Sequence, residues 1–176
     1  SPDIGGTRTV AAMHVAEVLG IPVENINPSV GDTDSIGYTS QTGGSSVAYK
    51  TGWSSYEAAQ DVKKKMIERA AIMWGIDTEQ VTYDKGILYH SSDPELKMTF
   101  NEVAEKMLST GGSVVGNAST NHRWHAPAFA THICDVEVDP DTGKVTILRY
   151  TTIQEVGKAI HPSSVEGQLQ GGAAQG

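Results

Sequence analysis

The chain has 176 residues, with 13 Lys and Arg against 21 Asp and Glu, so its formal net charge is −8. This balance argues against a nucleic-acid partner, which requires clustered cationic side chains, and no apolar run approaches the roughly 18 residues of a membrane span. The single cysteine, Cys134, excludes an internal disulfide framework and a Cys-rich metal site and favours a reducing, cytoplasmic setting.

The first half of the chain predicts two helices joined by polar loops. Apolar residues and alanines over 7–19, followed by a glycine and a proline, predict a short helix. A strand is expected around 25–30, followed by a turn at 31–35. Apolar residues at spacings of three and four over 47–74, with Gly75 as a stop, predict a long helix. The start at Ser1 resembles neither a signal peptide nor an initiator methionine, and we expect a piece of a longer polypeptide.

The second half predicts mainly antiparallel strands. Residues 81–83 and 87–89 flank a short turn, and the run TFNE at 99–102 is a capping box that begins a helix to about 108. A β region is expected after Gly112. Residues 129–138 and 144–152 predict a long hairpin across a turn rich in Asp, Pro and Gly.

A last helix is expected to begin near Pro162, capped by Ser163 or Ser164, and to lead into Gly171. The fold class is therefore α+β, with helices packed on mainly antiparallel sheets and a long β-hairpin. We expect one lobe segment over 1–110 and, over 111–176, the hairpin and closing helix of the same domain.

Three segments rich in small residues are candidates for ligand contact. Gly5, Gly6 and Thr7 precede or open a helix, where free amides and the helix dipole attract anions. The run QTGGSS at 41–46 repeats this arrangement, and residues 171–176 form a third stretch with Gln175 as donor and acceptor. Convergence would suit a large flat ligand with a phosphate tail, although tight turns and flexible linkers have a similar composition.

The clusters of polar side chains predict no metal site and no catalytic group within this chain. Asp32 and Asp34 lack the spacing of a calcium loop and are more typical of Asx turns. The spacings among four possible zinc ligands fit no standard finger; they are His122, His125, His132 and Cys134. The cysteine alternates with Ile133 and Asp135 on a predicted strand, so we expect a buried structural thiol rather than a nucleophile.

The ordered motifs resemble the molybdenum-binding large subunit of the xanthine dehydrogenase/aldehyde oxidoreductase family. Six runs carry the resemblance: SPDIGGTRT at 1–9, EVLGIP at 17–22, GDTD at 31–34, TGGSS at 42–46, FATHICDVEVDPDTGKV at 129–145 and VGKAIHPSSVEGQLQGGAAQG at 156–176. The likeness covers nearly the whole chain. It implies part of a two-lobed molybdopterin-binding domain.

The resemblance also implies a cofactor and a reaction. Such enzymes hydroxylate a carbon of an N-heterocycle or aldehyde with oxygen from water, and they pass electrons through [2Fe–2S] centres to FAD on partner chains or domains. Molybdenum is held by the molybdopterin dithiolene, here expected in the cytosine dinucleotide form, rather than by protein thiolates. The expected partners are the rest of the molybdenum subunit, the iron–sulfur and FAD subunits or domains, and a small-molecule substrate.

The resemblance assigns cofactor contacts to a specific set of residues: Gly5, Gly6, Thr7, Gly44, Ser45, Ser46, Val47 and Gln175. The first loop departs from the family, since Ile4 stands before Gly5 and Gly6 where relatives commonly have Gly-Gln-Gly. The family's general base is a glutamate in a Gly-rich Gly-Glu motif, which neither Glu155 nor Glu166 matches. We therefore expect no turnover from this chain alone. Two alternatives stay open: a non-catalytic module that binds another nucleotide or phosphate, and a scaffold whose strands pair with neighbouring chains.

Overall fold

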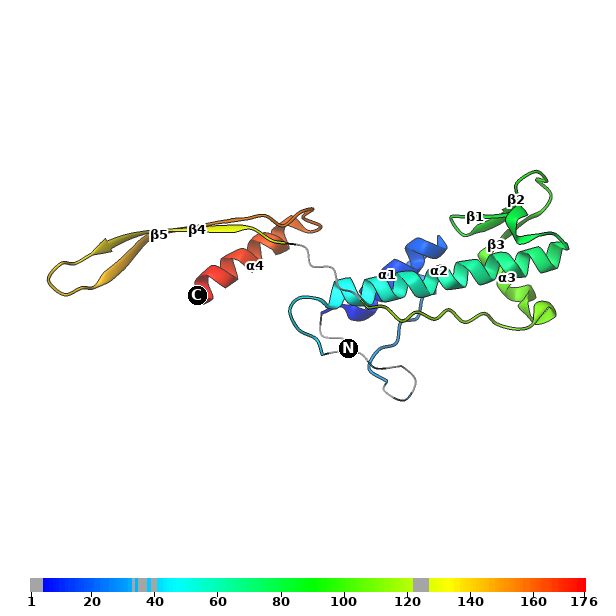
Figure 1. Ribbon diagram of the computed structural model, residues 1–176, viewed down its shortest axis with the longest axis horizontal. Helices are drawn as coiled ribbons and strands as arrows, with labels where there is room; N and C mark the ends of the chain where they lie inside the picture. Colours follow the sequence, from blue (N-terminus) through cyan, green and yellow to red (C-terminus); the bar gives the residue numbers. More distant parts are fainter. Residues whose placement is uncertain (1–4, 33, 35–37, 39–40, 122–126) are drawn as a thin grey trace. The chain divides into compact units, whose positions relative to one another are not determined.

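The computed structural model describes residues 5–32, 34, 38, 41–121 and 127–176 (Figure 1). The chain forms two compact units, residues 1–122 and 123–176. The helices are α1 (Thr7–Leu19), α2 (Val47–Trp74), α3 (Phe100–Lys106) and α4 (Pro162–Gln175). The strands are β1 (Val81–Asp84), β2 (Ile87–His90), β3 (Lys97–Thr99), β4 (Ala130–Val138) and β5 (Val145–Gln154). The predicted α+β class, with antiparallel sheets and a long hairpin, is confirmed.

Helix α1 lies beside the N-terminal half of α2, and the two helices run parallel (Figure 1). The imidazole of His14 lies directly against Gly52, where a Cβ atom would come within 2.7 Å of the ring. Further along both helices, the Tyr83 hydroxyl donates a hydrogen bond to the Leu19 carbonyl at 2.6 Å, and Lys63 of α2 lies 5.1 Å from the centre of the Tyr83 ring. The first contact joins His14 to Gly52, and the second joins Leu19 to Lys63 through Tyr83. Both helices therefore run in the same direction from the first contact to the second.

The main hydrophobic core lies between the C-terminal half of α2, the three-stranded sheet and α3 (Figure 1). The sheet has the order β1-β2-β3, and both pairings are antiparallel. Alternate residues such as Tyr83, Leu88 and Met98 face the core, because successive side chains of a strand point to opposite faces. Thr99 and Glu102 form the predicted capping box, which begins α3 directly after β3.

The segment after α3 runs back along α2. Lys65 donates to the Val115 carbonyl at 2.7 Å and to the Asp61 carboxylate at 2.7 Å, and that carboxylate also accepts from the Asn117 amide at 3.0 Å. These two donors hold the pKa of Asp61 below its usual value. Gly116 allows the close approach, because a Cβ atom there would lie 2.3 Å from the Ala58 carbonyl oxygen.

The second unit consists of the β4–β5 hairpin and α4. The two strands pair antiparallel with a bulge between Asp135 and Val136, and the 139–143 turn is closed by the Gly143 amide, which donates to the Asp139 carbonyl at 2.8 Å. Helix α4 contacts β5. Its half-buried residues are spaced four apart, as a helix face requires; they are Val165, Leu169 and Ala173.

Several predictions about local structure are wrong. Residues 26–30 form no strand; they follow a 3₁₀ turn at Val23–Asn25, and none of the strands in the described part of the chain pairs with them. The segment after Gly112 pairs with side chains of α2 rather than with a strand, and β4 begins only at Ala130. The fold places the boundary between its compact units at 122/123. The division into functional segments at 110/111 stays a prediction.

The end of the chain also differs from expectation. His161, rather than a serine, caps α4, because its Nδ1 accepts from the Ser164 amide at 3.3 Å. The glycines at 171 and 172 lie inside α4, which continues to Gln175, so this third stretch is not a loop. Cys134 is exposed rather than buried. The same holds more widely, since every residue among 127–176 is at least partly exposed.

Candidate functional site

Two glycine-containing loops lie at the same end of the α1–α2 pair. Eight residues, about 12 Å of helix, separate Gly6 from His14, and six residues, about 9 Å, separate Ser46 from Gly52. Since His14 contacts Gly52 and the helices are parallel, the N-termini of the two helices lie at nearly the same distance, along the helix axes, from this contact. Packed helices have axes roughly 8–10 Å apart, so one extended ligand can reach both ends. We call this region, Gly5–Thr7 with Gly43–Val47, the glycine-loop end.

The glycine-loop end is electrostatically suited to an anion. Neither α1 nor α2 has a side-chain cap or an acidic residue in its first turn. Each N-terminus therefore presents a partial positive charge of about half an elementary charge. Arg8 and Lys50 add a cationic side chain to the first turn of each helix.

The backbone of the second loop is shaped by three consecutive residues. Gly44 and Ser45 both have positive φ, of 62° and 53°, and the Ser46 hydroxyl donates to the Gly43 carbonyl at 2.8 Å. Positive φ is uncommon for a residue with a Cβ atom and is often found at functional sites. The Ser46 hydroxyl proton is thus used inside the loop, which leaves its backbone amide as the group for a ligand.

Space around the glycines leaves the backbone accessible. A Cβ atom built on Gly5, Gly6 or Gly44 meets no atom of the described residues within 4 Å. Close packing against other described residues of this unit is therefore not the reason for glycine at these positions. For Gly6 and Gly44 the positive φ is a local reason for glycine, and open space beside exposed amides permits a ligand to approach closely.

The remaining expected site residues have different surroundings. Gln175 is exposed and is the last residue of α4, in the second compact unit. Asp32 accepts a hydrogen bond from the Asp34 amide at 3.0 Å, which is the Asx-turn geometry expected from the sequence. His132 bonds the Tyr150 hydroxyl at 3.0 Å, whereas His122 and His125 lie outside the described residues. Within the described ranges, no group of three His, Cys, Asp or Glu side chains could hold a metal ion.

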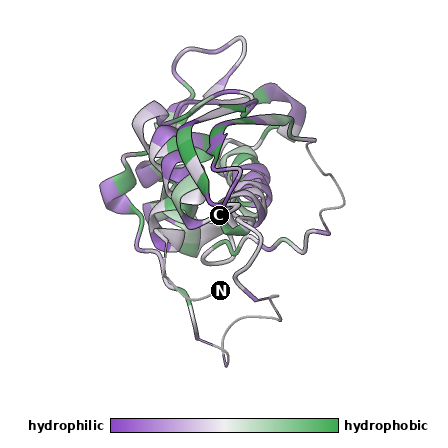
Figure 2. Cartoon of the chain, turned by 90° about the vertical axis from the view of Figure 1, so that its left-hand side faces the viewer, coloured by the Kyte–Doolittle hydropathy of each residue, from purple (hydrophilic) through white to green (hydrophobic). Residues whose placement is uncertain are grey.

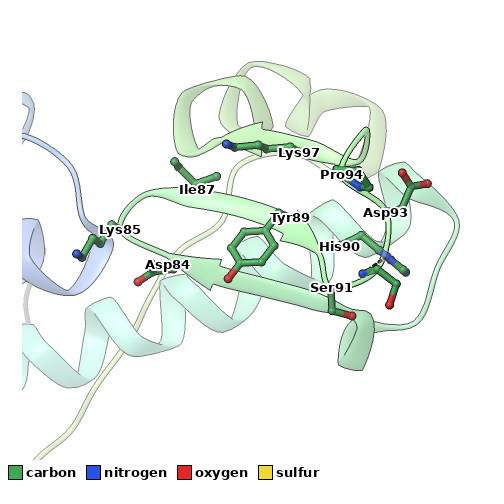
Figure 3. Close-up of a pocket in the computed structure, with 10 residues that line it drawn as sticks. Asp84, Lys85, Ile87, Tyr89, His90, Ser91, Asp93, Pro94 and Lys97 are labelled. Carbon is green, nitrogen blue, oxygen red and sulfur yellow. Dashed lines mark hydrogen bonds between the residues drawn. The ribbon is translucent and has the colours of Figure 1, made fainter.

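A separate hollow of about 560 Å³ lies on the outer face of the β1–β2–β3 sheet and was missed by the sequence reasoning (Figure 3). Ile87 and Tyr89 contribute its apolar surface, and Lys85 and Lys97 contribute its cationic groups. Lys85 contacts Gly20 at the C-terminal end of α1. Because α1 has 13 residues, the hollow begins about 20 Å from the glycine-loop end. The sequence signal for this outer face is the alternation along β2, in which Ile87 and Tyr89 lie on the face opposite Leu88.

The whole chain, residues 1–176, matches the protein family described as molybdopterin cofactor-binding domain. The chain belongs to this family. It is 31% identical over 180 aligned residues to the nicotine 6-hydroxylase large subunit of Paenarthrobacter nicotinovorans, covering 97% of this chain and 22% of that protein. It is 30% identical over 176 residues to the xanthine dehydrogenase molybdenum-binding subunit of Escherichia coli O157:H7, covering 97% and 23%.

A solved structure supports the same assignment. CO dehydrogenase from Oligotropha carboxidovorans matches with a TM-score of 0.67 and 26% identity, over 98% of this chain and 22% of that chain. The resemblance to large subunits of molybdenum hydroxylases is thereby confirmed. The chain spans less than a quarter of the length of these relatives. None of its described helices is both long and apolar enough to cross a membrane.

The residues of the glycine-loop end fit the chemistry of molybdopterin. The cofactor is anionic through its phosphate groups, and this end offers uncapped helix N-termini, a cationic first turn in each helix and unobstructed glycine backbone. No protein cysteine is needed, because the dithiolene of the cofactor holds the metal. The donor set thus suits a phosphate-bearing organic ligand rather than a bare metal ion.

Proposed function

We propose that the glycine-loop end holds the phosphate-bearing part of molybdopterin, in its cytosine dinucleotide form, within the large subunit of a molybdenum hydroxylase. The observation that carries this proposal is the parallel packing of α1 and α2, which brings two uncapped glycine-containing N-termini to one level. The amides of Gly6 and Ser46 are proposed to bind the anionic groups. The family resemblance also assigns contacts to Thr7, which is 2% exposed here, and to Gln175 of the second unit.

The names of the relatives support an expectation about the wider activity. We expect the complete enzyme to oxidise a C–H bond of an N-heterocycle or an aldehyde with oxygen derived from water, in the cytoplasm. When bound, the cofactor supplies molybdenum and its two-electron redox chemistry. The [2Fe–2S] centres and FAD are expected on partner chains or domains. This chain's own residues bind and orient the cofactor.

The general base is expected from a part of the large subunit outside residues 1–176. Glu155 is an unsuitable candidate, because its carboxylate accepts a hydrogen bond from the Gly157 amide within its own turn. Glu166 lies in α4, on a helix rather than in a Gly-rich loop. Hydroxylase turnover should therefore be undetectable with the purified 176-residue chain, and measurable turnover would contradict this part of the proposal.

Substitution of Ser45 tests the cofactor site. Ser45→Asp places a carboxylate beside the proposed phosphate position, whereas Ser45→Asn is of nearly equal size and neutral. Both side chains tolerate the positive φ of this residue, and an acidic residue near a helix N-terminus favours the helix. Molybdenum and cytidine monophosphate released per purified large subunit should fall at least tenfold in Ser45→Asp and stay near wild type in Ser45→Asn. Equal cofactor content in the two variants would reject the site.

A further inference from the structure

The β4–β5 hairpin has one face made almost entirely of uncharged side chains. Three consecutive cross-strand pairs on alternate positions share this face: Cys134 with Tyr150, Val136 with Ile147, and Val138 with Val145. We call these six residues the apolar hairpin face. Each of its large apolar side chains is 46–62% exposed, and the cysteine is exposed too.

The opposite face of the hairpin carries the charges. There Asp135 pairs with Arg149 in a salt bridge of 2.8 Å, and Glu137 lies opposite Thr146. This face is mixed, because Ile133 and Ile153, 48% and 59% exposed, share it with these charges, whereas the apolar hairpin face carries no charged side chain. Figure 2 colours the chain by hydropathy and shows hydrophobic and hydrophilic residues interspersed along it. The apolar hairpin face fits an apolar partner surface and not a charged ligand.

The second unit has no core of its own among its described residues. Every side chain in residues 127–176 is at least partly exposed, and α4 leaves the apolar hairpin face uncovered. An isolated two-stranded hairpin is at best marginally stable in water, and sheets become independently stable when a third strand or a packed element covers the apolar side. The apolar hairpin face therefore needs an occupant.

We infer that this occupant is an apolar strand or helix face from the part of the same large subunit outside residues 1–176. The inference rests on the proposed function, in which the chain acts within such a subunit. The CO dehydrogenase match covers 98% of this chain but 22% of that protein, so a similar fold there belongs to a polypeptide over four times as long. The rest of such a polypeptide can supply a strand or helix that covers the apolar hairpin face, and its covalent linkage gives that strand or helix a high effective concentration.

Cys134 makes the inference testable, because it lies on the apolar hairpin face and is the single cysteine in these residues. The rate of N-ethylmaleimide labelling at Cys134 is measured by peptide mass spectrometry in the folded large subunit and in the subunit unfolded in guanidinium. We expect labelling to be at least tenfold slower in the folded subunit. A smaller difference would overturn the inference.

The 176-residue chain by itself distinguishes the other occupants. At both 1 and 100 μM we expect Cys134 to be labelled within tenfold of the rate measured for the unfolded chain. Slow labelling only at 100 μM would overturn the inference in favour of a second copy of the chain. Slow labelling at both concentrations would overturn it in favour of cover from within these residues.

A matched pair of substitutions in the large subunit locates the covered face. Ile147→Asp puts a charge on the apolar hairpin face, and Thr146→Asp puts the same charge on the opposite face one residue away. We expect Cys134 to lose its protection in the first variant and to keep it in the second. Equal labelling of the two would contradict the assignment. Cofactor content is measured on the same samples. Exposed Cys134 in the wild-type subunit together with retained molybdenum would reject this inference while leaving the cofactor site intact.

Discussion

The buried hydroxyl of Tyr83 joins the end of α1 to the three-stranded sheet, and its removal should change the pH dependence of stability. The side chain is 7% exposed and donates to the Leu19 carbonyl. Burial raises the pKa of Tyr83 from 10.0 to about 12. In Tyr83→Phe the Leu19 carbonyl loses its donor, so the free energy of unfolding at pH 7 should fall by roughly 1–3 kcal/mol.

The sign of the pH effect follows from the raised pKa. Below pH 10 Tyr83 is protonated in both the folded and the unfolded chain, and its contribution to stability is fully present. Between pH 10 and about 12 the unfolded chain loses this proton while the folded chain retains it, so that contribution is lost. A pKa difference of two corresponds to roughly 2.7 kcal/mol, which is the upper bound on how far the gap between wild type and Tyr83→Phe should narrow.

Urea denaturation followed by circular dichroism at pH steps from 8 to 11.5 measures this gap. Tyr89→Phe is the matched control, because Tyr89 lies on the outer face of the same sheet and lines the hollow. We expect wild type and Tyr89→Phe to show the same pH dependence. A constant difference between wild type and Tyr83→Phe across this range would refute the buried, protonated hydroxyl.

Three further substitutions test the packing of the first unit. Gly116→Ala should lower the free energy of unfolding by about 1–3 kcal/mol, measured by urea denaturation, because its Cβ atom would clash with the Ala58 backbone; an unchanged value would contradict the close approach. Thr99→Ala should cost about 1 kcal/mol in the same assay through loss of the α3 cap, and no loss would argue against the capping box. Asp61→Asn should reduce stability at neutral pH. The pKa of Asp61 is lowered mainly by its hydrogen bond with Lys65, so the effect of the substitution should vanish as acid protonates wild-type Asp61. A loss of stability of equal size at pH 2 would contradict this ion pair.

Local signals in the sequence predicted the regular elements well. The α2 helix follows from its apolar spacing and from Gly75, whose positive φ of 67° ends it in the expected way. The β4–β5 hairpin follows from its β-branched strands and turn residues. Prediction failed where composition was ambiguous: Gly171 and Gly172 suggested a loop, but the four-residue spacing of α4 around them continues the helix.

The candidate site was only partly accessible to sequence reasoning. Glycine and hydroxyl residues before two helices indicated anion loops, but their shared level depends on the long-range contact of His14 with Gly52, 38 positions apart. No local pattern specifies such a pairing. The exposure of Cys134 was missed for a related reason, since alternation along a strand indicates which residues share a face but does not indicate which face is covered.

Titration of the ¹⁵N-labelled chain with inorganic pyrophosphate, followed by amide chemical shifts, tests the anion site most directly. The account predicts saturable shifts at Gly6 and Ser46, and little change at Ile87 and Tyr89 in the outer hollow. Shifts confined to the hollow, or no saturable shift at the glycine-loop end, would contradict it.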